Sequence, residues 1–325
     1  MSRTAWASAG LLAGGCVLSL AVGPISLFNA DLRSVALELR AVRTVLAMIA
    51  GASLAVGGVL MQGLFRNPLA DPGVIGAQGG AILGGQLAFL WVQLAQERLP
   101  KWLLPEMALP LGSVVGAVLA LAVLLPIARR ARSSLVVLLV GFLIGAFCVS
   151  VSGLVSTLSL RQGEGLARGL IAFSLGGVEG KGWHDVALAA PLTLAALIGG
   201  FQLGRMLDVL LAGEEEAVAL GVPVADLRRW AIVWCAMLTA AASVAAGAIA
   251  FVGLIVPHLV RGRVGALHRR VIPLAAVGGA AAVVGADVLS RLLPTPAPLP
   301  VSVISGLAGA PFFFWLLLRS PSLTT

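Results

Sequence analysis

The sequence predicts an all-α protein that crosses a membrane about ten times. Of its 325 residues, 59% are hydrophobic and 11% are charged, whereas about a quarter of the residues of an ordinary soluble domain are charged. The mean hydropathy is +1.03. The stretches 42–64 and 271–293 are apolar at odd and even positions alike, which excludes the alternation of a membrane β-barrel strand. Because a helix satisfies its own backbone hydrogen bonds in lipid, these stretches are expected to be helices.

Runs of about twenty apolar residues, the length that a helix needs to cross the hydrocarbon, mark the spans in order. The first run follows Arg3 and ends at Pro24 without a small-residue cleavage site, so it is interpreted as a retained span and not as a signal peptide. Pro257 limits the eighth span to half length, and glycine-rich sequence over 73–85 weakens the signal for the third. A helix at 166–175 is too short to cross and is expected at the outer membrane surface. The expected spans are 5–27, 41–64, 74–93, 107–127, 134–158, 186–204, 230–250, 252–260, 271–293 and 301–318.

The basic residues set the expected orientation. Most of the 22 Lys and Arg residues lie in segments that are cytoplasmic if the N-terminus is inside, as the positive-inside rule favours. The cluster ARRARSS at 128–134 is the densest of these segments. We therefore expect both termini in the cytoplasm, one transmembrane domain over 1–325, and a largest cytoplasmic loop at about 205–229.

Several functions lack the residues that they need. The sequence pI of about 11.1 is compatible with nucleic-acid binding, but no basic helix with interleaved aromatic residues is present. The three cysteines stand singly in apolar runs, so neither a disulfide framework nor a metal site is expected. A chain that hydrolysed ATP would need a glycine-rich loop ending in Gly-Lys-Ser or Gly-Lys-Thr. The only lysines, Lys101 and Lys181, are followed by Trp102 and Gly182.

An acidic stretch, GEEEAVALGV at 213–222, lies in the largest loop. Glutamates in the first turn of a helix interact favourably with the positive end of its dipole, and Gly221, with Pro223 shortly after it, is a typical helix stop. The stretch predicts a short helix that ends at Leu220. Ala217 and Leu220 are expected to share a face and to present a small apolar patch to a partner. A solvated acidic loop is the alternative that these residues leave open.

Four long motifs occur in order along the chain. They are RTVLAMIAGASLAVGGVLMQGLFRNPLADPGVIGAQGG (43–80), GEEEAVALGV (213–222), GAIAFVGLIVPHLVRGRVGALHRRVIPLAAVGGAAAVVGADVLSR (247–291) and GLAGAPFFFWLL (306–317). In this order and at this spacing, they resemble the permease subunit of the ABC importers for cobalamin, ferric siderophores and haem. The resemblance extends from about residue 30 to 318.

The resemblance implies an architecture and a set of partners. It implies ten helices in each permease, two copies in the membrane unit, two ATPase subunits on the cytoplasmic face and a periplasmic binding protein that delivers the ligand. The chain would be no enzyme and would bind no cofactor, because ATP and Mg belong to the ATPase. Its place would be the bacterial inner membrane, and its cargo haem or another iron chelate, with cobalamin as the alternative. An ATP-independent secondary transporter is the alternative from another class, and it would need ionisable residues that the spans almost lack.

The resemblance also assigns roles to residues. The loop between the sixth and seventh helices would enter a cleft on the ATPase through Glu214, Glu215, Glu216, Ala217, Leu220 and Gly221. Arginines at the outer ends of the second and ninth spans would receive glutamates of the binding protein, and these are Arg40, Arg43 and Arg291. A cytoplasmic gate would lie at the start of the fifth helix, at Ser133, Ser134 and Leu135.

Other interpretations of these positions stay open. The outer arginines could instead contact lipid headgroups, and a serine before the fifth span could serve only as a helix N-cap. Asp287, four residues before Arg291, is expected to hold that arginine in an intrahelical pair. Where the family usually has Glu-Leu-Pro, this chain has Pro-Leu-Pro at 298–300, so no role is carried over for this outer loop. The pairs that predict close helix contacts are Gly80 with Gly84, Gly112 with Gly116, and Gly141 with Gly145.

Overall fold

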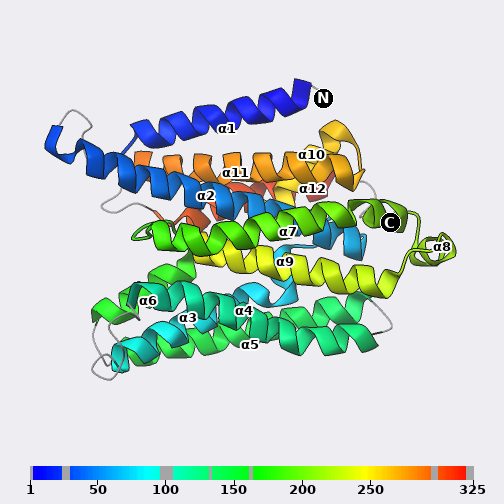
Figure 1. The fold of residues 1–325 in the computed structure, drawn as a ribbon, viewed down its shortest axis with the longest axis horizontal. Coiled ribbons are helices and arrows are strands. Elements are labelled where there is room, and N and C mark those ends of the chain that lie inside the picture. Colours follow the sequence, from blue (N-terminus) through cyan, green and yellow to red (C-terminus); the bar gives the residue numbers. More distant parts are fainter. Residues whose placement is uncertain are drawn as a thin grey trace.

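The computed structural model describes residues 3–23, 30–95, 105–131, 134–160, 164–293 and 299–319. In these residues every regular element is a helix, and the long helices run side by side along one direction (Figure 1). The expectation of an all-α fold is confirmed. Each expected span corresponds to one helix: α1 (Arg3–Ala21), α2 (Ala30–Phe65), α3 (Ala77–Leu94), α4 (Pro105–Arg130), α5 (Ser134–Ser159), α7 (Trp183–Leu210), α9 (Val224–Ala246), α10 (Val252–Val264), α11 (His268–Leu292) and α12 (Val301–Arg319). The short elements between them are η1 (Pro72–Ile75), α6 (Glu164–Leu175) and α8 (Glu214–Ala219).

Several helices extend beyond the apolar runs that predicted them. α2 begins at Ala30, α7 ends at Leu210 and α9 begins at Val224, in each case further into polar sequence than hydropathy indicates. Hydropathy marks only the part of a helix that suits lipid, whereas Arg and Glu are also good helix formers. α9 in turn ends earlier than expected, at Ala246, because Gly247 adopts a φ of 66°.

Six of the described helices are long and apolar enough to cross a membrane by themselves: α2, α4, α5, α7, α9 and α11. Shorter apolar stretches lie in α1, over Trp6–Ala21, and in α12, over Val301–Phe312. α10 has 13 residues and contains Pro257, which agrees with the half-length eighth span. The chain is therefore a polytopic membrane protein whose spans differ in length.

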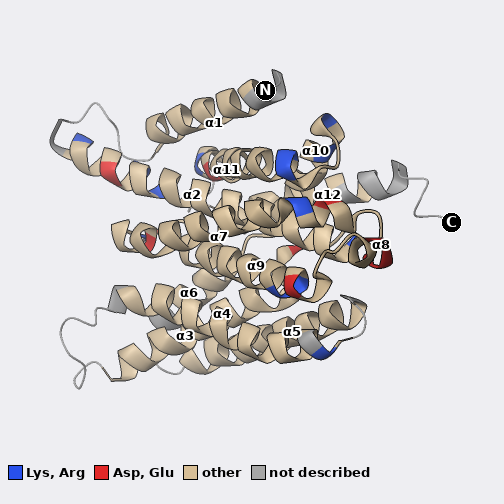
Figure 2. Ribbon diagram, turned by 45° about the vertical axis from the view of Figure 1, so that its right-hand side comes forward, with Lys and Arg blue, Asp and Glu red and all other residues tan. Residues whose placement is uncertain are grey.

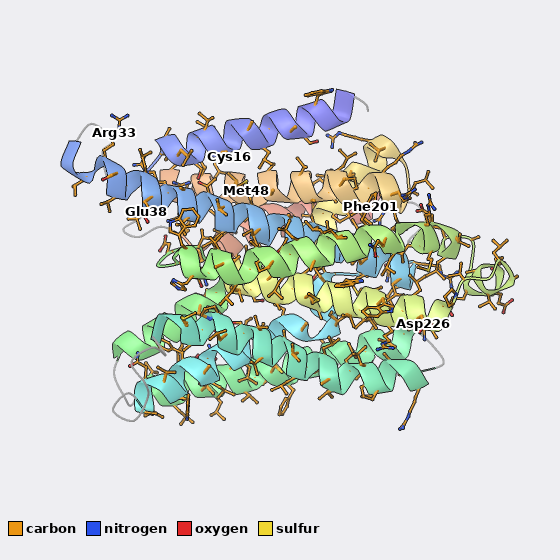
Figure 3. All side chains as sticks on the ribbon, in the orientation of Figure 1. Cys16, Arg33, Glu38, Met48, Phe201 and Asp226 are labelled. Carbon is orange, nitrogen blue, oxygen red and sulfur yellow. The ribbon has the colours of Figure 1, made fainter. Side chains whose placement is uncertain are left out.

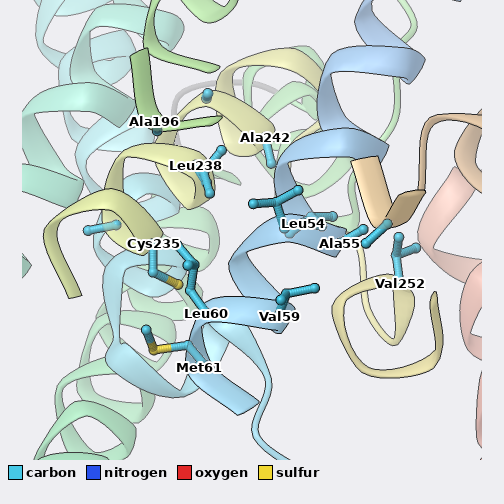
Figure 4. Packing of buried hydrophobic residues seen from close by; sticks show 14 of the residues in the cluster. Leu54, Ala55, Val59, Leu60, Met61, Ala196, Cys235, Leu238, Ala242 and Val252 are labelled. Carbon is cyan, nitrogen blue, oxygen red and sulfur yellow. The ribbon is translucent and has the colours of Figure 1, made fainter. Parts of the chain in front are cut away.

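The hydrophobic core lies between α2, α9 and α11. The most apolar window of α2 is 78% buried and that of α9 is 72% buried, whereas that of α5 is only 22% buried. The central helices are thus surrounded by protein, and α5 keeps a broad apolar face outside the chain. Figure 4 shows Leu54, Leu60 and Met61 of α2 facing Cys235 and Leu238 of α9.

Glycines bring pairs of helices into backbone contact. A Cβ placed on Gly84 would lie 2.3 Å from the carbonyl oxygen of Gly112, and one on Gly116 would lie 2.0 Å from that of Gly80. These two predicted pairs therefore face each other across α3 and α4. α2 and α11 meet in the same way, since a Cβ on Gly51 would lie 2.1 Å from the Gly279 carbonyl oxygen.

The two ends of the bundle differ in what they carry. The start of α1, the end of α12 and α8 lie at one end, and α6 lies at the other (Figure 1). Charged residues gather toward both ends, and the middle of the bundle is nearly free of them (Figure 2). Arg33 and Glu38 mark the α6 end and Asp226 marks the α8 end (Figure 3).

Candidate docking and coupling sites

At the α8 end, residues 211–223 form a compact segment that projects from the bundle (Figure 1). α8 runs from Glu214 to Ala219, with all three glutamates in its first turn, where they meet the positive end of the helix dipole. Gly213 precedes the helix with a φ of 145°, and Gly221 follows it with a φ of 82°. The short helix and its glycine stop are confirmed.

One side of α8 is fixed to the bundle. Ala217 is fully buried, and α8 packs on α7 and α9. Glu214 forms an ion pair of 3.2 Å with Arg228 of α9. The remaining glutamates, Glu215 and Glu216, are exposed.

The apolar patch on α8 differs from the expected one. Ala217 and Leu220 were expected to share an exposed face, but Ala217 faces the bundle. The exposed apolar side chains are Val218 and Leu220, at 61% and 72% exposure. The expectation was wrong because the packing of the helix on its neighbours decides which side of it faces outward. The segment thus offers two carboxylates beside two apolar side chains.

At the opposite end, Asp287 of α11 lies between two arginines. Its Oδ1 accepts a hydrogen bond of 2.6 Å from Arg43 Nε, and its Oδ2 lies 2.8 Å from Arg291 Nη2. The expected intrahelical pair of Asp287 and Arg291 is confirmed. Arg43 also reaches Glu179 at 3.4 Å, and Glu179 is 49% exposed.

Arg40 is held separately from this cluster. It is 5% exposed, and its Nη1 donates hydrogen bonds of 2.9 Å to the backbone carbonyls of Leu20 and Ala21 at the end of α1. Arg291 likewise donates to the carbonyl oxygens of Ser19 and Val22, at 2.9 and 2.7 Å. Arg40 and Arg291 therefore fasten α1 to α2 and α11.

A cavity of about 370 Å³ opens beside these arginines. Lys181 lies at its wall and donates a 2.7 Å hydrogen bond to the Val244 carbonyl oxygen. Burial lowers the pKa of the Lys181 ammonium, and the nearby Asp185 carboxylate partly opposes that shift. The cavity is rich in positive charge, because its charged lining consists of Arg40, Arg43, Glu179, Lys181 and Arg291.

The proposed gate lies at the start of α5, which Figure 1 places at the α8 end. Ser134 is the first residue of α5, Leu135 is exposed, and Ser133 lies outside the described residues. Pro298 of the altered outer loop also lies outside them. Beside it, Ser302 at the start of α12 donates a hydrogen bond to the Leu175 carbonyl oxygen at the end of α6.

A larger cavity, of about 750 Å³, lies between α3, α5, η1 and α10. Phe142, Val149 and Phe251 form apolar parts of its wall. Asp71 also lines it and caps η1, accepting a 2.8 Å hydrogen bond from the Gly73 amide. Sequence reasoning missed this cavity, although the turn Asp-Pro-Gly within the first motif marks its position. Among the described residues, no group of three or more His, Cys, Asp or Glu could hold a metal ion.

A family model identifies the protein family of this chain. The model of the FecCD transport family matches residues 8–319. The chain belongs to the FecCD transport family. The resemblance seen in the sequence motifs is thereby confirmed, and the chain is a permease subunit of an ABC importer in the family that serves haem, iron chelates and vitamin B12.

Several curated members of the FecCD family align over most of their length. The hemin transport system permease protein HmuU of Yersinia pestis is 38% identical over 87% of this chain and 83% of its own. The Fe(3+) dicitrate permease FecD of Escherichia coli is 36% identical over 88% and 85%. The vitamin B12 import permease BtuC of Klebsiella pneumoniae is 36% identical over 87% and 82%.

A solved structure supports the FecCD fold. It is described as an inward-facing conformation of a metal-chelate type ABC transporter. It covers 98% of this chain and 99% of its own, with a TM-score of 0.84 and 28% sequence identity. The whole described bundle, and not one part of it, therefore has the fold of an ABC permease.

Proposed function

We propose that this permease moves haem or another iron chelate from a periplasmic binding protein into the cytoplasm, driven by a separate ATPase. The observation that carries the proposal is the placement of two different surfaces at opposite ends of one bundle. α8 presents carboxylates and apolar side chains at one end. Arg43 and Arg291, which pair with Asp287 and together form the arginine cluster, lie at the other. Such a pair of surfaces suits one partner that supplies movement and another that supplies cargo.

The proposed orientation places α8 in the cytoplasm. The start of α1 and the end of α12 lie at the α8 end (Figure 1), and most Lys and Arg residues lie in the segments assigned to that side, as the positive-inside rule favours. Both termini would then be cytoplasmic in the inner membrane. The complete importer would contain two copies of this chain, two ATPase subunits and one binding protein, with ATP and Mg held by the ATPase and no cofactor in the permease.

The roles of the site residues form part of the proposal. On the cytoplasmic side, α8 with Leu220 and Gly221 would enter the ATPase, and the exposed Val218 would replace the buried Ala217 in the apolar contact. On the outer side, Arg40, Arg43 and Arg291 would meet carboxylates of the binding protein, since Arg–carboxylate contacts give orientation as well as attraction. The start of α5, including Ser133, Ser134 and Leu135, would form the cytoplasmic gate.

Haem suits the larger cavity better than a strongly polar chelate does. Aromatic and aliphatic side chains form much of its wall, and such walls favour a flat apolar ligand with few fixed polar contacts. Cobalamin is the alternative within the family. Uptake by proteoliposomes that contain the binding protein, with haem, ferric dicitrate and cobalamin offered in competition, separates these cargoes, and we expect haem to be taken up in preference.

A secondary transporter, the alternative from another class, differs from an ABC permease in its energy source. The chain is reconstituted in liposomes with or without its ATPase, and haem uptake is measured with Mg-ATP, without nucleotide and with an imposed ion gradient. We expect uptake only when the ATPase and Mg-ATP are both present. Uptake by the chain alone along an ion gradient would identify a secondary transporter and contradict the proposal.

A further inference from the structure

The segment 211–223, which carries α8, is called the coupling segment. The end of α7, just before it, is fixed to the start of α11. Asp208 Oδ1 accepts a 2.5 Å hydrogen bond from the backbone amide of His268 and lies 2.8 Å from His268 Nδ1. The His268 ring is fully buried. It rests on the backbone of α2 at Gly63, where an added Cβ would lie 2.4 Å from His268 Nε2. Asp208 and His268 thus join α7, α11 and α2 at one point, which we call the junction.

Two neighbouring contacts strengthen the junction. The Arg269 guanidinium lies over the Phe201 ring, 5.3 Å from its centroid, in the geometry of a cation–π contact. Gly204 allows close approach at the next turn, since an added Cβ would lie 3.1 Å from Arg269 Cγ. The last turns of α7 are therefore packed directly against the first turn of α11.

α11 continues from the junction to the arginine cluster. A helix rises about 1.5 Å per residue, so Asp287 lies roughly 28 Å along α11 from His268. Pro273 removes one backbone hydrogen bond near the start. Beyond it, the backbone contact of Gly51 with Gly279 presses α11 against α2. At the far end, the ion pair of Arg43 on α2 with Asp287 on α11 joins the two helices again.

We infer that Asp208 and His268 are positioning residues that transmit movement of the coupling segment, through α11, to the arginine cluster. The inference rests on the proposed function, because it needs an ATPase at one end and a binding protein at the other. Packed interfaces switch as rigid bodies between discrete arrangements, and a coupling free energy acts equally in both directions. Removing the contacts of the junction should therefore stop movement at one end from reaching the other. The coupling segment and the arginine cluster should keep their structures.

The surfaces themselves do not depend on the junction. α8 is held by Ala217 and by the ion pair of Glu214 with Arg228. The arginine cluster is held by Asp287. A variant without the junction should still bind the ATPase and the binding protein. This separation makes coupling measurable apart from assembly.

The test measures the stimulation ratio, which is ATP hydrolysis with haem-loaded binding protein divided by hydrolysis without it. The permease–ATPase complex is reconstituted in liposomes with Asp208→Ala or with Asp208→Asn. We expect Asp208→Ala to lower the ratio by about threefold or more, with a matching fall in haem uptake and an unchanged yield of complex. Asp208→Asn keeps an acceptor for the His268 amide, so it should restore most of the ratio.

The matched control is Asp226→Ala, which removes an exposed carboxylate from the first turn of α9 at the same end of the bundle (Figure 3). Its stimulation ratio should equal that of the wild type. If Asp208→Ala does not assemble, His268→Asn provides a second test, because it removes the ring that packs on α2 at Gly63 and the contact of that ring with Asp208.

A wild-type ratio in the assembled Asp208→Ala or His268→Asn complex would overturn the inference and leave the proposed function intact. An equal loss of the ratio in Asp226→Ala would also overturn it, because the effect would then not belong to the junction. Haem uptake by wild-type chain without any ATPase would instead contradict the proposed function.

Discussion

Asp287 is a fully buried carboxylate that holds two arginines from two helices. The arginine side chains are themselves largely buried, at 17% exposure for Arg43 and 3% for Arg291. A buried charge is costly unless it is paired. The single carboxylate therefore makes it possible to keep two positive charges close together at the α6 end of the bundle.

Replacing Asp287 with Asn should destabilise the protein strongly. The change keeps the side-chain shape but leaves the buried Arg291 without its carboxylate partner and leaves Arg43 with only the half-exposed Glu179, which costs on the order of 3 kcal/mol. Thermal unfolding in detergent measures the effect. The control Glu38→Gln alters an exposed acid near the same end and should leave the unfolding temperature unchanged. Equal stability of Asp287→Asn and the wild type would show that the ion pairs contribute nothing.

Glu179 should slow the arrival of the binding protein. Its carboxylate pairs with Arg43 at 3.4 Å and is 49% exposed, so the pair adds little to stability. Glu179→Gln leaves more positive potential at the proposed docking surface, and complementary charge acts chiefly on the association rate. We expect association about twofold faster at low salt, measured by stopped-flow mixing with labelled binding protein.

Salt provides the control for this prediction. Raising the ionic strength screens exposed charges, so the difference between Glu179→Gln and the wild type should disappear. An unchanged or slower association rate of Glu179→Gln at low salt would argue against docking at the arginine cluster.

Sequence spacing predicts contacts within a helix better than contacts between helices. The pair of Asp287 and Arg291 was predictable, because residues four apart on a helix are neighbours. The bond from Arg43 to Asp287 joins residues 244 positions apart, and no local pattern marks it. Arg40, three residues before Arg43, turns to α1 for the same reason: tertiary packing decides each side chain separately.

At the scale of elements, local signals defined where α8 is and packing defined how it is oriented. Three glutamates and a terminal glycine sufficed to predict a short helix. Its buried side could not be predicted, because it depends on how the flanking helices α7 and α9 pack around it in three dimensions, which local spacing does not encode. The same distinction explains α2, whose apolar part was predicted and whose polar start at Ala30 was not.

The exposed apolar pair of α8 should carry much of the contact with the ATPase. Replacing Val218 and Leu220 with Ser removes exposed side chains only, so folding should be unaffected. Interfaces depend on a few apolar anchors, and we expect binding to weaken about tenfold or more. Co-purification and titration of labelled ATPase subunit measure the loss.

Leu267→Ser is the matched control, since Leu267 is an exposed leucine outside the segment 211–223, at the same end of the bundle. It should bind the ATPase as the wild type does. Wild-type affinity in the Val218→Ser/Leu220→Ser variant would show that the ATPase seats elsewhere.

At the scale of the whole molecule, the bundle separates a rigid centre from an exposed flank. α2, α9 and α11 form the centre, and the 22% burial of the most apolar window of α5 leaves its outer face uncovered by the rest of the chain. The hydropathy of a span depends only on its own consecutive residues, so the number and order of the spans could be predicted from sequence. Hydropathy carries no information about which spans are central, and the cavity beside α5 depends on that arrangement.

The most direct test of the whole account replaces residues 213–221 with a Gly-Ser segment of equal length, which removes α8 and preserves chain connectivity. ATPase co-purification and Mg-ATP-driven haem uptake are measured on the same reconstituted sample. The account predicts that the ATPase is lost and that uptake falls to the level seen without nucleotide, while the permease still folds. An ATPase that stays bound, with uptake at the wild-type rate, would contradict it.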